Sequence, residues 1–186
     1  MASSPSRILL DTSAFRRLRS GDERVAAAIA AARSVALSVV TLGELEAGAQ
    51  LGVRAADNRA ALAEFLAAPF VSVLPITTDV ARVYGRIFAE LRRAGRPIGV
   101  NDIWIAAGAI ESGSHLVTFD VDFRRVAGLD ATILAVKRQT YDLMGHSPRG
   151  ALVRLERVRG RADRAFRVEH LGHEQRLMRA CSPGPQ

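Results

Sequence analysis

The 186-residue chain has one cysteine, few aromatic residues (5%) and no long apolar run. A single thiol, Cys181, cannot form an internal disulfide or supply a multi-cysteine zinc site, so both kinds of scaffold are excluded. No stretch approaches the roughly 20 apolar residues that cross a bilayer. The apolar residues 8–10 are too few for the core of a signal peptide. We therefore expect a cytoplasmic protein that does not contact membranes.

Positive charge is unevenly distributed along the chain. The formal net charge is +7, and residues 137–186 hold 11 Lys and Arg against 5 Asp and Glu, so they carry nearly all of it. Such a segment either serves solubility or binds a polyanion, because phosphate contacts dominate nucleic-acid affinity. We treat residues 1–136 as one domain and 137–186 as a basic C-terminal extension of unknown order, in which residues 166–178 have the pattern of an amphipathic helix.

Apolar runs alternate with helical patterns over residues 7–136. Buried runs rich in β-branched residues predict strands, and apolar residues at helical spacing predict helices. The expected strands are residues 7–11, 35–40, 71–75, 115–118 and 131–136. The expected helices are a short one capped by Thr12 or Ser13, then residues 22–32, 41–51, 56–67, 78–93 and 101–112. This alternation predicts an α/β fold with a four- to five-stranded, mostly parallel sheet between helices.

Four acidic residues stand just past an apolar run or at an expected helix start: Asp11, Glu44, Asp102 and Asp120. In an open α/β sheet such positions fall along one edge, where ligands bind. Carboxylates gathered there repel one another unless cations lie between them. Mg²⁺ and Mn²⁺ prefer carboxylate and water oxygens, and no cluster of Cys and His competes for the metal. The pattern favours a divalent-metal site that cleaves a phosphodiester.

Each acid also has a purely structural interpretation. Thr41 and Glu44 have the form of a capping box, and Asp102 suits the positive end of a helix dipole. Asp120 and Asp122 suit a turn, and Asp11 closes a strand, a common loop position. The joint placement of the acids, with separations of 33, 58 and 18 residues, lets each come from a different element and favours the functional interpretation.

Four stretches, residues 8–15, 38–45, 95–107 and 116–123, each carry one of these acids in a distinctive context. Together and in this order they resemble the PIN-domain nucleases and, within them, the VapC-type toxins of bacterial toxin–antitoxin pairs. The resemblance covers about residues 7–136 and leaves the extension out. It implies a PIN-like α/β/α sandwich and an Mg²⁺- or Mn²⁺-dependent endoribonuclease that cleaves single-stranded or loop RNA.

The resemblance also implies roles for individual residues. Asp11, Glu44, Asp102 and Asp120 correspond to the catalytic, metal-binding quartet, with Asp11 and Asp102 as the firmest ligands. The expected auxiliary residues are Asp122, Thr12, Thr118 and Asn101, and the favoured role of Asn101 is to cap its helix. The implied partners are RNA, a cognate VapB-like antitoxin and a second copy of the chain. Apolar helices near residues 42–51 and 56–65 are candidate antitoxin contacts.

Two alternatives stay open. One is a housekeeping RNA-processing nuclease with the same site and no antitoxin. The other is a non-catalytic RNA-binding module whose acids are structural and whose basic extension binds RNA. Arg16, Arg17 and Arg19, which follow the first acid, either meet RNA phosphates or form a solvated helix face.

Overall fold

The computed structural model describes residues 5–52, 55–135, 152–157 and 166–171, and the structural statements below concern these residues. Its main sheet has five strands, all parallel, in the order β3-β2-β1-β4-β5. The strands are β1 (Arg7–Leu10), β2 (Ser34–Ser38), β3 (Val71–Leu74), β4 (His115–Thr118) and β5 (Ala131–Ile133). The predicted α/β class with a parallel sheet is therefore confirmed.

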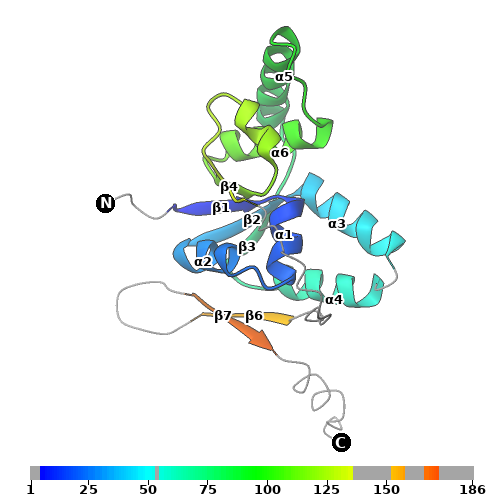
Figure 1. The fold of residues 1–186 in the computed structure, drawn as a ribbon, viewed down its shortest axis with the longest axis vertical. Helices are drawn as coiled ribbons and strands as arrows, with labels where there is room; N and C mark the ends of the chain where they lie inside the picture. The colour runs from blue at the N-terminus through cyan, green and yellow to red at the C-terminus, as the bar shows by residue number, and fades with distance from the viewer. Residues whose placement is uncertain (1–4, 53–54, 136–151, 158–165, 172–186) are drawn as a thin grey trace, which may run out of the picture.

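Helices cover both faces of this sheet (Figure 1). The described residues form α1 (Thr12–Arg19), α2 (Glu23–Ala31), α3 (Val39–Leu51), α4 (Ala55–Leu66), α5 (Thr78–Arg93), α6 (Val100–Glu111) and the 3-10 helix η1 (Val121–Arg125). Helices α1, α2 and α4 pack on one face, and α5 and α6 on the other. No helix in this part of the chain is both long and apolar enough to cross a membrane.

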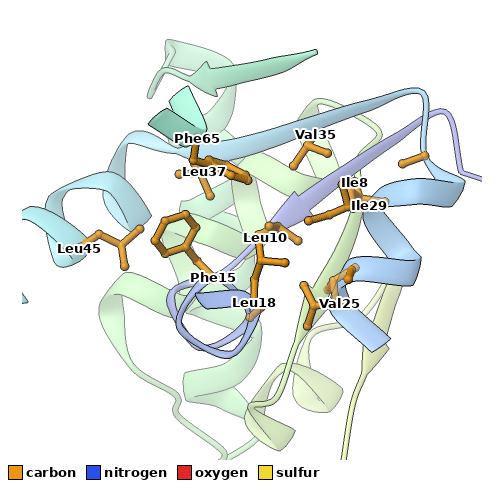
Figure 2. Packing of buried hydrophobic residues seen from close by; sticks show 14 of the residues in the cluster. Ile8, Leu10, Phe15, Leu18, Val25, Ile29, Val35, Leu37, Leu45 and Phe65 are labelled. Carbon is orange, nitrogen blue, oxygen red and sulfur yellow. The ribbon is translucent and has the colours of Figure 1, made fainter. Parts of the chain in front are cut away.

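The central strand β1 has side chains in both halves of the core. Ile8 and Leu10 face one cluster, and Leu9 between them faces the other. Figure 2 shows the first cluster, in which the side chains of α1, α2 and α4 pack on the sheet: Phe15, Leu18, Val25, Ile29 and Phe65. Because a covered parallel strand is buried on both faces, its residues form a continuous apolar run. This burial fixes the position of Asp11, the residue that follows β1.

The second cluster holds α5 against α6. Val80, Ile87 and Leu91 form the buried stripe of α5, as the helical spacing predicted. The ring of Tyr84 stacks on that of Trp104, with centroids 4.0 Å apart. Trp104 therefore packs between α5 and α6 and orients the first turn of α6.

Several helices begin differently from the sequence prediction. Asp11, rather than Thr12 or Ser13, caps α1, and Ser38 caps α3, so Val39 and the residue after it are helical instead of extending β2. An N-cap residue needs extended backbone angles, and the last residue of a strand or its neighbour already has them (ψ 178° at Asp11, 154° at Ser38). The strand end therefore serves directly as the cap.

The described part of the C-terminal extension is β-structure. Strands β6 (Leu152–Arg157) and β7 (Phe166–Leu171) pair in an antiparallel two-stranded sheet. The predicted helix is therefore wrong over residues 166–171, and residues 172–178 lie outside the described part. The physical reason is local: Phe166 and Val168 alternate with charged residues, a period of two that suits a strand.

Candidate active site

The carboxyl edge of the sheet brings the four acids together. Asp11 follows β1, and Asp120 lies just beyond the neighbouring strand β4. Glu44 lies in α3, which begins directly after β2, and Asp102 lies in the first turn of α6. The charges of the other three acids all act on Asp102 and raise its pKa. The residues predicted from four separate elements thus share one electrostatic environment.

Asp11 is almost fully buried, with 4% of its surface exposed. Its carboxylate accepts hydrogen bonds from the backbone N–H of Ala14 (2.7 Å), the hydroxyl of Ser13 (2.9 Å) and the hydroxyl of Thr118 (2.6 Å). Burial raises the pKa of Asp11, while these three donors oppose the rise by favouring the charged form. The carboxylate therefore has a fixed orientation at the join between β1 and β4.

Ser13 is a site residue that the sequence prediction missed. Its hydroxyl lies 2.9 Å from each carboxylate oxygen of Asp11 and accepts a hydrogen bond from the backbone N–H of Phe119 (2.9 Å). Thr118 makes a similar link, because its hydroxyl accepts from the backbone N–H of Asp120 (2.9 Å) while donating to Asp11. The signal for Ser13 is its position two residues after an aspartate, where hydroxyls commonly bond back to a turn.

Glu44 is held by two side chains from other helices. Asn101 donates its amide N–H to Oε1 of Glu44 (2.7 Å), and the hydroxyl of Thr12 donates to Oε2. The structural alternative for Glu44, a capping box with Thr41, is not formed, since Thr41 donates its N–H to Ser38 instead. The contacts link the first turns of α1 and α6 to α3.

The predicted capping role of Asn101 is also wrong. Helix α6 begins at Val100, and its N-cap is Gly99, which makes no side-chain capping bond. Asn101 consequently lies inside the first turn, from which its amide reaches Glu44. The alternative role, hydrogen bonding to an acid, is the one that the geometry favours.

Asp102 has the most perturbed environment of the four acids. Its pKa is raised to about 6, first by burial and then by the negative charges of Asp120, Glu44, Asp11 and Asp122. A Cβ placed on Gly99 would come within 2.5 Å of Oδ2 of Asp102. Because Gly99 has an ordinary φ of −56°, glycine is needed there for space and not for backbone conformation. The residue before α6 thus leaves room for the Asp102 carboxylate.

Asp120 and Asp122 shape the loop after β4. Asp120 caps η1 by accepting the backbone N–H of Asp122 (2.8 Å). Asp122 pairs with Arg125 (3.1 Å), and Arg125 also donates to the carbonyl of Pro97 (3.0 Å), in the loop before α6. Asp122 therefore adds negative charge at the site while serving mainly to tie η1 to that loop.

The donor set fits a hydrated hard cation. All candidate ligands are carboxylate oxygens, and burial together with the repulsion from its neighbours raises the pKa of Asp102. A cation would relieve that repulsion. Within the described ranges, however, no three Asp, Glu, His or Cys side chains are grouped tightly enough to hold one ion by themselves. Mg²⁺ tolerates this, since it usually keeps several waters and takes one or two carboxylates. A closed zinc-type cage does not fit.

Comparison with known proteins agrees with this geometry. Residues 8–129 match the PIN domain family, a span that is more than half of the chain and contains all four acids. The chain belongs to the PIN-domain family. Ribonuclease VapC5 of Mycobacterium tuberculosis is 36% identical to it over 129 residues, which cover 69% of this chain and 93% of the relative. This PIN domain therefore falls among the VapC ribonucleases.

Two solved VapBC structures share its fold. VapBC-5 of Mycobacterium tuberculosis, a member of the VapBC family of toxin-antitoxin systems, has a TM-score of 0.56 and 32% identity, covering 71% of this chain and 100% of that one. VapBC2 of Rickettsia felis, bound to a DNA fragment from its promoter, has a TM-score of 0.62 and covers 68% of this chain and 98% of that one. At 23% identity, the second likeness concerns the fold alone.

Proposed function

We propose that this PIN-domain protein is a VapC-like endoribonuclease toxin that hydrolyses RNA phosphodiester bonds with Mg²⁺ or Mn²⁺. The observation that carries the proposal is the convergence of the four acids, where burial and then the charges of its acidic neighbours raise the pKa of Asp102 to about 6. A merely structural carboxylate gains nothing from placement beside three others. Perturbed carboxylates gathered at a ligand-binding sheet edge are typical of a catalytic centre.

In this proposal, Asp11 and Asp102 hold the metal most firmly, and Glu44 and Asp120 orient the attacking water. The bound ion would supply charge stabilisation to the phosphate as one P–O ester bond is replaced by a bond to water oxygen. The chain contributes orientation. Asp11 is fixed by three donors, and both oxygens of Glu44 are held by side-chain donors. Such rigid placement reduces the reorganisation that the reaction would otherwise require.

The proposed inhibitor is a VapB-like antitoxin. Support comes from relatives such as VapBC-5, which belongs to a toxin-antitoxin family. A cationic side chain of the antitoxin, typically arginine, would neutralise the carboxylates by charge-assisted hydrogen bonds. Helices α3 and α4 remain the candidate contacts, and Leu51 at the end of α3 is 90% exposed. We also propose a homodimer and a cytoplasmic location.

The test is cleavage of end-labelled single-stranded RNA by the purified full-length protein, with added Mg²⁺ or Mn²⁺ and with EDTA. Asp102→Asn is compared with Glu111→Gln, which removes an exposed acid from the opposite end of the same helix. We expect divalent-dependent cleavage that Asp102→Asn abolishes and Glu111→Gln retains. RNA binding without cleavage would instead support the non-catalytic module.

The housekeeping alternative needs a separate observation. If the protein is a toxin, a small protein encoded beside it should co-purify with it and suppress cleavage. Divalent-dependent cleavage with no such inhibitor would favour the RNA-processing nuclease.

A further inference from the structure

A pocket of about 520 Å³ opens beside the acidic site. It is lined by residues of α1 and of the loop after β4: Ser13, Arg16, Arg17, Ser20, Phe119, Asp120 and Val121. Ser13 and Asp120 also belong to the acidic site, as shown by their hydrogen bonds around Asp11 and Thr118. The pocket is thus continuous with the site and extends it along α1.

Two guanidinium groups, those of Arg16 and Arg17, line this pocket against one carboxylate, that of Asp120. Arg17 lies over the ring of Phe119, 5.5 Å from its centroid. Arg16 reaches toward α3, where a Cβ on Gly48 would lie 3.1 Å from its Nη2. Both residues are on the exposed surface of α1, in its last turn.

Neither guanidinium has an ion-pair partner within the part of the chain that the structure describes. Among the residues that the structure describes, no carboxylate lies within 4.0 Å of the side-chain nitrogens of Arg16 or Arg17. Arg24 provides the contrast, because it also covers the Phe119 ring (5.2 Å) but is paired with Asp22 at 2.6 Å. Two unpaired cations in a concavity favour an anion, since guanidinium groups bind phosphates through directed hydrogen bonds.

The position along α1 indicates which anion. Arg16 is five residues beyond Asp11, a rise of about 7.5 Å along the helix axis. Helical side chains lean toward the helix N-terminus, which directs these two toward the acids without reaching them. A phosphate held there lies beside the group being cleaved and is not that group itself.

We propose that Arg16 and Arg17 form a subsite for the phosphodiester next to the scissile one in a single-stranded RNA. The cation–π contact with Phe119 pre-positions Arg17. This inference rests on the proposed nuclease function, and it assigns the pocket a role in substrate positioning and not in the chemical step. An acidic peptide is the rival occupant, but continuity of the pocket with the acidic site favours the polynucleotide.

The test compares two double variants of the full-length protein. Arg16→Gln/Arg17→Gln removes both pocket charges and keeps long polar side chains that suit a helix. Arg7→Gln/Arg33→Gln removes the same charge from the opposite edge of the sheet, where β1 and β2 begin. In an Asp102→Asn background, binding of fluorescein-labelled single-stranded RNA is measured by anisotropy over a range of salt concentrations. Steady-state cleavage is measured without the Asp102 change.

We expect the pocket variant to bind RNA about tenfold more weakly at low salt, because hydrogen bonds to a charged group are lost. The slope of log K against log salt should become shallower by about 0.7, the value for one phosphate contact on a single strand. In cleavage, KM should rise while kcat stays near that of the unmodified protein. The control variant Arg7→Gln/Arg33→Gln should differ little from the unmodified protein in RNA affinity, salt slope and KM.

Equal losses of RNA affinity in both double variants would overturn the subsite, because the lower net positive charge of the protein would then explain them. Unchanged RNA binding and an unchanged salt slope in Arg16→Gln/Arg17→Gln would overturn it as well. If the unmodified protein cleaves RNA with a divalent ion while the two variants behave alike, the proposed function stands and only the subsite fails. If it neither binds nor cleaves RNA, both fail.

Discussion

Replacing Asp102 with Asn should stabilise the metal-free protein while abolishing cleavage. Asp102 is the acid whose pKa is raised to about 6, by burial and by four neighbouring negative charges. Asn has the same shape and no charge, so the substitution removes both the repulsion and the cost of burying a charge. A residue whose removal increases stability but destroys activity is maintained for function.

The expected gain in stability of Asp102→Asn follows from the pKa of Asp102. A rise from 3.8 to about 6 corresponds to about 3 kcal/mol of unfavourable interaction in the charged form. Asp102 is only partly buried, so solvent screening reduces this to about 1–2 kcal/mol. For a protein of this size, each kcal/mol shifts the melting temperature by about 2–4 °C. Asp102→Asn should therefore melt about 2–8 °C higher at pH 7.5 in EDTA.

The stability difference between Asp102→Asn and the unmodified protein also depends on pH. The folded protein binds the Asp102 proton more tightly than the unfolded chain does, so folding loses stability as pH rises from about 4 to above 6. The advantage of Asn should consequently vanish below pH 4 and be complete above pH 7. Calorimetry at several pH values, with Glu111→Gln as the control, measures both. A lower melting temperature for Asp102→Asn at pH 7.5, or a gain of equal size at pH 4, would refute the reasoning.

Three further predictions concern the same site. Asp11→Asn should destabilise the protein by about 1–3 kcal/mol in urea titration, because an amide cannot accept from all three buried donors; an unchanged midpoint would contradict this. Gly99→Ala should leave the melting temperature within about 1–2 °C but lower kcat at least tenfold, since the added methyl displaces the Asp102 carboxylate; unaltered kcat would show that the carboxylate has room to move. Mn²⁺ binding should strengthen as pH rises through about 6, because the ion competes with the proton that Asp102 holds in the metal-free protein; an Mn²⁺ affinity that stays constant from pH 5 to 7.5 would exclude Asp102 as a ligand.

The meeting of the acids at one edge followed from the sequence because parallel strands place their carboxyl ends together. The apolar run before Asp11 and the one before Asp120 each mark a strand, and the structure places these strands side by side. Burial of β1 on both faces then leaves little freedom in where Asp11 lies. This part of the site is set by local patterns that a single sequence displays.

The hydrogen bonds around the acids could not be predicted in the same way. Thr118 and Asp11 are 107 residues apart, and their contact depends on which strand neighbours β1. Asn101 was expected to cap its helix, and its contact with Glu44 arises because α6 begins one residue earlier. Periodicity does not determine a helix start to within one residue. A shift of one residue nevertheless decides where a polar side chain such as that of Asn101 points.

The C-terminal extension shows a different limit of prediction from the sequence. Apolar residues over 166–178 suit a helix when the whole range is considered, but Phe166 and Val168 alternate with charged residues and lie in β7. Hairpin pairing with β6 supplies the hydrogen bonds that an isolated strand lacks. The competing pattern was present in the sequence, but the pairing partner was not apparent.

The most direct test of the central claim is to measure Mn²⁺ binding to the purified protein by calorimetry. The unmodified protein is compared with Asp11→Asn, Glu44→Gln, Asp102→Asn and Asp120→Asn, and Glu111→Gln is the control. If the four acids share one metal site, each of their variants should bind Mn²⁺ at least tenfold more weakly, and the control should bind normally. Unaltered Mn²⁺ affinity in both Asp11→Asn and Asp102→Asn would contradict the account.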